Sequence, residues 1–267
     1  MSKVIALAGS CHPGPTIAVT SIAVLLGVSA DLRGTLLLLV GVTVLVGQLS
    51  IGWANDWLDA DRDAAAARTD KPTTTGSISP STLRAAALMS LALSLPLSLI
   101  PGWSGAWHLL LVASGWGYNL GLKKTVWSPV PYVVGFAALP VYVLVVAGVE
   151  EQWLLPAAGG LLGVSAHFAN VAPDVAEDRA AGVWGLPQRI GPRGSLVIAL
   201  VLLSSVGALL LAELRLSGAA LLLSGTLVLL PLVGGSVLVV RNRIGRPVFT
   251  MVMVAAVADV VLLLIAT

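Results

Sequence analysis

Two short acidic stretches contain the residues best suited to chemistry, and the first begins at Asn55. Its carboxylates Asp56, Asp59 and Asp63 are spaced i, i+3 and i+7, so they share one face if the stretch is helical. Asn55 borders this face, whereas Asp61 lies away from it and is expected to face solvent. Crowded carboxylates repel one another unless a cation lies among them, and oxygen ligands of this type favour Mg²⁺. The stretch, called the first motif below, therefore predicts a magnesium site.

The second acidic stretch begins at Asn170 and is called the second motif. Asn170, Asp174 and Asp178 are spaced i, i+4 and i+8 and also share a helical face, although Pro173 must kink or restart the helix before Asp174. This spacing alone is weak evidence. It gains value because it matches the first motif in its leading asparagine and in its position after a hydrophobic run.

A charge count indicates that the two motifs are halves of one site. Their facing carboxylates bring about five negative charges, a diphosphate ligand would add about three, and two Mg²⁺ ions offset about four of these. Basic residues must therefore lie nearby, and the sequence places several after each motif and after Tyr118–Asn119. These are Arg62, Arg68, Lys71, Lys123, Lys124, Arg179 and Arg189.

The elements that must position these residues are membrane-spanning helices. The 267 residues are 57% hydrophobic and only 10% charged, and the mean hydropathy is +0.95. The apolar runs are continuous, without the alternation of a barrel strand, which predicts an all-α polytopic bundle of about nine transmembrane helices forming one domain over residues 1–267. The predicted spans are Thr16–Ala30, Thr35–Ala54, Arg84–Ile100, Ala106–Leu120, Val130–Val149, Trp153–Val171, Ser195–Leu211, Ser217–Val240 and Val248–Ala266.

Positive charge predicts the orientation of this bundle. Thirteen of the 15 Lys and Arg residues fall at the N-terminus or in the loops after the second, fourth, sixth and eighth spans, and only Arg33 and Arg215 fall in the opposite loops. This bias places the N-terminus and the two long motif loops, about 55–83 and 170–194, in the cytoplasm of a bacterial-type plasma membrane. The basic residues form no single tract, so nucleic acid is not an expected partner, and the single cysteine, Cys11, excludes an internal disulfide.

These motifs resemble those of the UbiA superfamily of intramembrane prenyltransferases. The resemblance lies in the NDxxDxxxD pattern that begins at Asn55, the Lys71–Ser79 string after it, Tyr118 with the later pair Lys123–Lys124, and Asp174 and Asp178 followed by Gly182 and Leu186–Gly191. One difference is His12–Pro13, where the family commonly has Arg-Pro before its first span. We expect this difference to concern the end of the site that binds the acceptor.

The resemblance implies a helical bundle around a central apolar cavity, with Mg²⁺ and a prenyl diphosphate at its cytoplasmic mouth. The reaction that the resemblance implies is ionisation of the allylic diphosphate and alkylation of a lipophilic acceptor, such as an aromatic quinone precursor, within the lipid bilayer. The implied roles are catalysis for Asp59, Asp63, Asp174 and Asp178; diphosphate binding for Asn55, Arg68, Lys71, Tyr118, Lys123, Lys124 and Arg189; and metal binding for Asn55, Asp56, Asp59, Asp63, Asn170, Asp174 and Asp178.

Several alternatives stay open. The first motif could be a solvated helix end, although four of the 13 acidic residues within nine positions argue against scattered charge. The same site could cyclise a prenyl diphosphate to a terpene without an acceptor. A transporter is a third possibility, but it would place ionisable residues near the membrane midplane. His12, His108 and His167 are interpreted as hydrogen-bonded to neighbouring helices, and Asp259, within the last span, as either functional or reaching the membrane interface.

Overall fold

The computed structural model describes residues 3–66, 68–69, 71–149, 153–241 and 246–265, and every regular element in these ranges is a helix. Each of the nine predicted spans coincides with one helix of 16 residues or more. These are α2 (Pro13–Ser29), α3 (Gly34–Leu58), α5 (Pro80–Leu99), α6 (Gly105–Leu120), α7 (Val130–Ala147), α8 (Leu154–Val171), α11 (Pro192–Leu214), α12 (Gly218–Val240) and α13 (Arg246–Ile265). The all-α fold class is therefore confirmed.

Short helices lie between the long ones and carry most of the residues of interest. They are α1 (Lys3–Gly9), α4 (Ala60–Ala65), η1 (Gly102–Ser104), η2 (Leu122–Lys124), η3 (Ala172–Asp174), α9 (Val175–Ala180) and α10 (Leu186–Ile190). Proline, which fits the first turn of a helix, begins α2, α5 and α11. Ser79 caps α5, since its side chain accepts a hydrogen bond from the Thr82 amide.

Six of these helices are long and apolar enough to cross a membrane, namely α3, α5, α7, α8 extended through α9, α11 and α12. The pair α1 and α2, bent by 65°, would make a seventh, and residues 250–265 of α13 form a shorter apolar helix. The count of nine crossings therefore stays a prediction. Ala266 and Arg243, which the predicted topology uses, lie outside the described residues.

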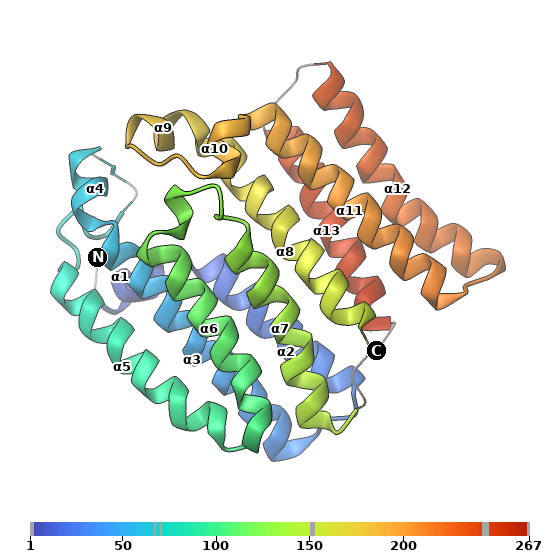
Figure 1. Ribbon diagram of the computed structural model, residues 1–267, viewed down its shortest axis with the longest axis horizontal. Coiled ribbons are helices and arrows are strands. Elements are labelled where there is room, and N and C mark those ends of the chain that lie inside the picture. Colours follow the sequence, from blue (N-terminus) through green and yellow to red (C-terminus); the bar gives the residue numbers. More distant parts are fainter. Residues whose placement is uncertain (1–2, 67, 70, 150–152, 242–245, 266–267) are drawn as a thin grey trace. The chain divides into compact units, whose positions relative to one another are not determined.

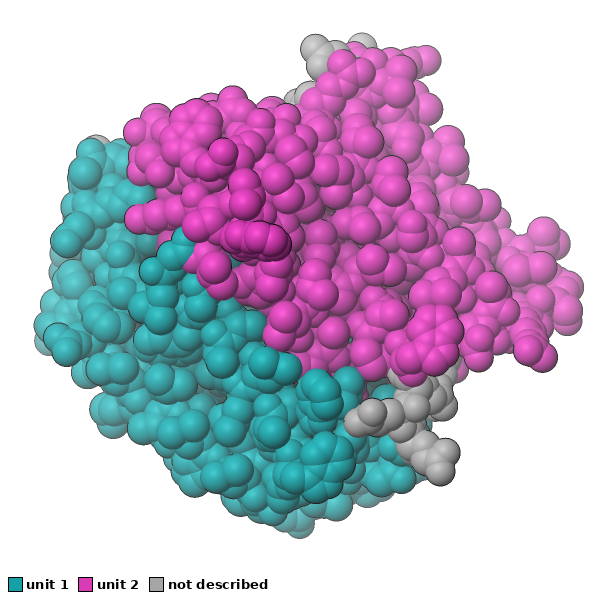
Figure 2. Space-filling view, viewed as in Figure 1, with its two compact units in different colours: residues 1–121, 141–151 teal, residues 122–140, 152–267 magenta. Residues whose placement is uncertain are grey.

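The chain divides into two compact units, coloured separately in Figure 2, and each is described by itself. The first contains residues 1–121 and 141–151. In it α3 packs against α2, α5 and α6 (Figure 1). Close approach depends on glycine in α3, because a Cβ at Gly47 would lie 2.7 Å from Nε2 of the buried His108. His108 Nδ1 lies 2.7 Å from Ser98 Oγ on α5, which confirms the predicted bond to a neighbouring helix.

The second unit contains residues 122–140 and 152–267. Here α8 packs against α11, which in turn packs against α12 and α13 (Figure 1). Gly159 and Gly163 let α8 approach the start of α7, since added Cβ atoms would lie 2.5 and 2.6 Å from the carbonyl oxygens of Phe136 and Tyr132. Small residues at helix contacts are typical of membrane bundles, where close backbone packing replaces the hydrophobic effect.

Candidate active site

The first motif forms one buried acidic face, as its spacing predicts. Although α3 ends at Leu58 and α4 begins at Ala60, the backbone hydrogen bonds continue through the junction, from Asp59 N to Asn55 O at 3.0 Å and from Asp63 N to Asp59 O at 2.9 Å. Asp56, Asp59 and Asp63 are 1%, 7% and 2% exposed, whereas Asp61 is exposed. Three aspartates are thus held together in surroundings that penalise their charge.

Two side chains bind the same oxygen of Asp56. Lys71 Nζ lies 2.6 Å from Asp56 Oδ1, and His12 Nε2 lies 2.9 Å from it. Lys71 is therefore at the first motif, as the sequence predicts. The bend between α1 and α2 brings the His12 ring to the acidic face, and its bond to Asp56 on α3 confirms the predicted hydrogen bond to a neighbouring helix.

Asp59 and Asp63 share Arg62, whose Nη2 lies 2.9 Å from Asp59 Oδ2 and 3.6 Å from Asp63 Oδ1. The other oxygen of Asp63, Oδ2, is buried and has no hydrogen-bond partner among the described residues. Burial raises the pKa of Asp63 above its usual value, against the opposing effects of Lys71 and Arg62, and Asp59 raises it further. The first motif therefore holds a buried carboxylate oxygen that a cation would satisfy.

A tight loop fixes Lys71 and Arg68. Thr74 Oγ1 donates to the carbonyl oxygens of both Arg68 and Lys71, and Ser77 N donates to Pro72 O at 3.0 Å. Gly76 makes the turn possible with a φ of 71°, a left-handed conformation that favours glycine. Predicted diphosphate-binding residues thus sit on a loop closed by its own hydrogen bonds.

Asn119 is a site residue that the sequence reasoning missed. Its Oδ1 accepts a 2.9 Å hydrogen bond from Asn55 Nδ2, and its own Nδ2 donates to the Ile51 carbonyl oxygen at 2.9 Å. Asn55 uses its amide nitrogen in this bond, so its Oδ1 stays the atom suited to a cation. Only the neighbouring Tyr118, half-buried at the end of α6, stood out in the sequence.

The second motif, in the second unit, is more open than the first. Asn170 and Asp174 are exposed and Asp178 is half-buried. Pro173 lies in η3, between the end of α8 and the start of α9, so the predicted interruption of the helix is present. Asp178 Oδ2 accepts a 2.8 Å hydrogen bond from Nε2 of the buried Gln188, a second residue that the sequence reasoning missed.

The four basic residues of the second unit that the sequence places near the motifs divide into two groups. Arg179 donates to the Gln188 carbonyl oxygen and lies over the Trp184 ring at 5.6 Å, and the exposed Arg189 donates from Nε to the Trp184 carbonyl at 2.9 Å. Both therefore bind the loop itself. Lys123 and Lys124 lie side by side in η2, the first buried and the second exposed.

Two further ionisable residues lie inside helices of the second unit. His167 Nε2 lies 3.0 Å from Ser128 Oγ, and its ring stacks on Tyr132 with centroids 4.5 Å apart. Asp259 is fully buried and neither carboxylate oxygen has a hydrogen-bond partner among the described residues. The Asp259 side chain therefore does not extend to the exposed surface, and its Oδ1 lies beside α11, where a Cβ added at Gly207 would be 2.9 Å away.

The metal ligands that the described residues offer suit Mg²⁺ better than a metal whose coordination sphere must come entirely from protein side chains. Among the described residues no group of three or more His, Cys, Asp or Glu side chains is arranged to hold a metal ion. Mg²⁺ does not require one, because it binds through one or two carboxylates and completes its octahedron with water and phosphate oxygens. The buried Asp63 Oδ2 meets that requirement in the first motif.

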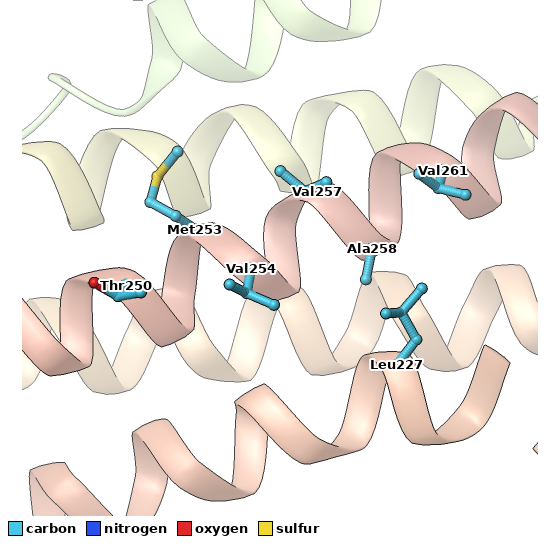
Figure 3. Close-up of a pocket in the computed structure, with 7 residues that line it drawn as sticks. All are labelled: Leu227, Thr250, Met253, Val254, Val257, Ala258 and Val261. Atoms are coloured by element: carbon cyan, nitrogen blue, oxygen red, sulfur yellow. The ribbon is translucent and has the colours of Figure 1, made fainter. Parts of the chain in front are cut away.

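A pocket of about 350 Å³ lies elsewhere, on α12 and α13 of the second unit (Figure 3). It is lined by Leu227, Thr250, Met253, Val254, Val257, Ala258 and Val261. No predicted site residue is among them, and apart from the Thr250 hydroxyl the lining side chains are apolar. We assign no chemistry to this pocket.

Together the apolar helices and the buried acidic face define an integral, multi-pass membrane protein. The sequence model of the UbiA prenyltransferase family matches residues 15–257, and the chain belongs to this family. The resemblance seen in the motifs is thereby confirmed. No curated protein matches the sequence.

Solved structures with the same fold cover nearly the whole chain. A UbiA homologue from Archaeoglobus fulgidus bound to GPP and Mg²⁺ is 15% identical, with a TM-score of 0.72 over 98% of this chain and 99% of its own. An apo UbiA homologue from Aeropyrum pernix K1 is 20% identical, with a TM-score of 0.69 over 93% of this chain and 98% of its own. A digeranylgeranylglyceryl phosphate synthase is 17% identical, with a TM-score of 0.69 over 99% of both chains.

Proposed function

We propose that the protein transfers a prenyl group from a prenyl diphosphate to a lipophilic acceptor in the membrane, with Mg²⁺ as cofactor. The observation that carries this proposal is the first motif, where buried aspartates are paired with Lys71 and Arg62 and one oxygen of Asp63 has no partner among the described residues. Membership of the prenyltransferase family supports it, as do the similar structures that hold GPP or DMAPP together with Mg²⁺.

Each motif supplies oxygen ligands of the kind that a magnesium–diphosphate group needs. In the first unit Asn55, Asp56, Asp59 and Asp63 would hold metal, and in the second Asn170, Asp174 and Asp178 would do so. Bound Mg²⁺ would neutralise the diphosphate and stabilise the charge that develops as it leaves. That the two motifs serve one diphosphate is part of the proposal and rests on the charge count.

The basic residues assist the departure of diphosphate. Lys71 and Arg68 from the first unit, and Lys123, Lys124 and Arg189 from the second, are proposed to contact phosphate oxygens, and Tyr118 to donate a hydrogen bond. The bond between the allylic carbon and the diphosphate oxygen breaks with both electrons leaving on oxygen. The acceptor's electron pair then forms the new carbon bond, and the acceptor loses a proton. Apolar helices exclude the water that would quench the cation.

The orientation follows from the charges. We propose that the N-terminus and both motif loops face the cytoplasm, since the basic residues gather in the loops on that side. A bacterial-type plasma membrane and a single domain with a central apolar cavity complete the proposal.

A product assay tests the function. The purified protein is incubated with labelled prenyl diphosphates, Mg²⁺ and candidate acceptors, and lipid products are identified by mass spectrometry. Asp59→Ala and Asp174→Ala are expected to lose activity, while Asp61→Asn, a matched change at an exposed position of the same motif, retains it. Equal turnover by all variants would contradict the proposal, and a hydrocarbon released without any acceptor would indicate a cyclase instead.

A further inference from the structure

We propose that His12 is a positioning residue for Asp56, an inference that rests on the proposed function of the first motif. His12 Nε2 lies 2.9 Å from Asp56 Oδ1, the oxygen that Lys71 also reaches. Because an ionised carboxylate only accepts, the imidazole donates its Nε2–H. Two donors on Oδ1 restrict rotation of the carboxylate, so Oδ2 is the oxygen through which Asp56 would bind a cation.

The backbone around His12 is built to place this ring. Helices α1 and α2 meet at an angle of 65°, and His12 stands at the bend, before Pro13 begins α2. His12 has a φ of 53° and a ψ of 69°, a left-handed conformation that is unfavourable for residues other than glycine. Such a conformation persists where surrounding contacts enforce it, and it often marks functional positions.

Contacts with α3 enforce the bend. A side chain at Gly52 would overlap the carbonyl group of Cys11, so α3 passes directly against the backbone next to His12. The same carbonyl oxygen accepts a 2.7 Å hydrogen bond from Thr16 Oγ1. Gly52 lies one helical turn before Asp56. This close approach therefore fixes the position of His12 along the axis of α3, next to the Asp56 carboxylate.

Helix α1 also packs against the end of the loop that carries Lys71, the other donor to Asp56. Ala6 of α1 is buried in one cluster with Ile78 and Leu83, and Leu7, Trp53 and Trp57 pack around it. Trp53 Nε1 donates to the Leu7 carbonyl oxygen at 2.9 Å. Ile78 ends the loop that carries Lys71, so α1 both leads into His12 and packs against the end of the loop that carries the other donor.

A role in orienting Asp56 is separable from a role in packing. The His12 side chain is half-buried, with 39% of its surface exposed, so a replacement that tests its hydrogen bond must also conserve its size. In His12→Gln, the amide nitrogen lies at a similar distance along the side chain as His12 Nε2 and conserves the hydrogen-bond donor to Asp56. Phe conserves the ring shape and removes the donor, so the two substitutions separate hydrogen bonding from size.

The test compares full-length wild type, His12→Gln and His12→Phe in two assays. The first is the thermal stabilisation that Mg²⁺ with inorganic pyrophosphate produces, which needs no turnover. The second is the half-saturating Mg²⁺ concentration for prenyl transfer. For His12→Phe we expect a smaller stabilisation and an about tenfold higher half-saturating Mg²⁺, as is typical when a partner of a metal ligand is removed. His12→Gln should resemble wild type, and all three should have similar Tm values without ligands.

The outcomes separate this inference from the proposed function. If wild type turns over prenyl diphosphate and His12→Phe matches it in both assays, His12 does not position Asp56 although the function holds. If wild type shows no turnover, the proposed function fails. The comparison of thermal stabilisation by Mg²⁺ with pyrophosphate in wild type and His12→Phe then tests by itself whether His12 positions Asp56. If His12→Phe lowers the Tm without ligands, His12→Ala is measured instead, and wild-type stabilisation by pyrophosphate in that variant contradicts the inference.

Discussion

Asn119 Oδ1 accepts a 2.9 Å hydrogen bond from Asn55 Nδ2, and this bond joins the end of α6 to the start of the first motif on α3. Asn119 also donates to the Ile51 carbonyl, one turn earlier on α3. The amide of Asn55 is therefore oriented by a residue 64 positions away in sequence. Its remaining oxygen is held where the motif begins.

Replacing Asn119 with Leu should impair both stability and activity. The change removes two hydrogen bonds at a buried position, which costs about 1–3 kcal/mol when a partner is left unsatisfied. We expect a lower Tm and at least a several-fold loss of turnover. Ser114→Ala is the matched control, because the Ser114 hydroxyl bonds to the Leu111 carbonyl of its own helix. Wild-type behaviour of Asn119→Leu would show that Asn55 needs no support from α6.

Lys71→Met should lower the stability of the protein, because the buried carboxylate of Asp56 loses its charged partner. Lys71 lies 2.6 Å from this nearly inaccessible carboxylate, and a hydrogen bond to a charged group contributes about 1.5–3 kcal/mol. We expect a lower Tm and a loss of prenyl transfer, measured with labelled diphosphate. Lys71→Arg keeps the charge and should restore the Tm more fully than the activity. A Tm unchanged in Lys71→Met would contradict the ion pair.

Asp63→Asn should affect stability and metal binding in opposite directions. Burial raises the pKa of Asp63, which means that the native state holds the charged form at a cost, and a neutral side chain of the same shape removes that cost. Without metal, the variant should be at least as stable as wild type. Stabilisation by Mg²⁺ with pyrophosphate should be lost. Retained stabilisation would exclude Asp63 as a metal ligand.

The acidic face was predictable from the sequence, because a period of 3.6 residues fixes which aspartates share a side. Asp56, Asp59 and Asp63 are all buried and Asp61 is exposed, in agreement with this division into two sides. The positions of the long helices were predictable because continuous apolar runs admit few other structures in a membrane. Their ends moved by several residues where polar residues continue the helix, as at the end of α3.

The partners of the site residues were not predictable, because they depend on contacts between distant segments. His12 reaches Asp56 across 44 positions through the bend between α1 and α2. Arg179 and Arg189 also bond to backbone carbonyls of their own loop, and their charge alone did not indicate these partners. A one-dimensional pattern shows that charges are near in sequence, but the loop's own unsatisfied carbonyls compete for them.

Gln188→Glu should disturb the second motif more than Gln188→Met. Gln188 Nε2 donates to Asp178 Oδ2 at 2.8 Å, so a glutamate would place a second carboxylate against the first. Without metal we expect a lower Tm for the Glu variant than for the Met variant, which loses the bond without adding charge. Added Mg²⁺ should narrow the difference. Equal Tm values for the two variants would show that Gln188 does not contact Asp178.

The most direct test of the central claim is release of inorganic diphosphate from a prenyl diphosphate, measured in membrane lipid extract as the source of acceptor. Wild-type protein should release diphosphate with Mg²⁺, stop when the metal is chelated, and form a prenylated lipid in equal amount. Asp61→Asn should match wild type, and Asp59→Ala should not. Release that continues without divalent metal, or that is equal in Asp59→Ala and wild type, would contradict the account.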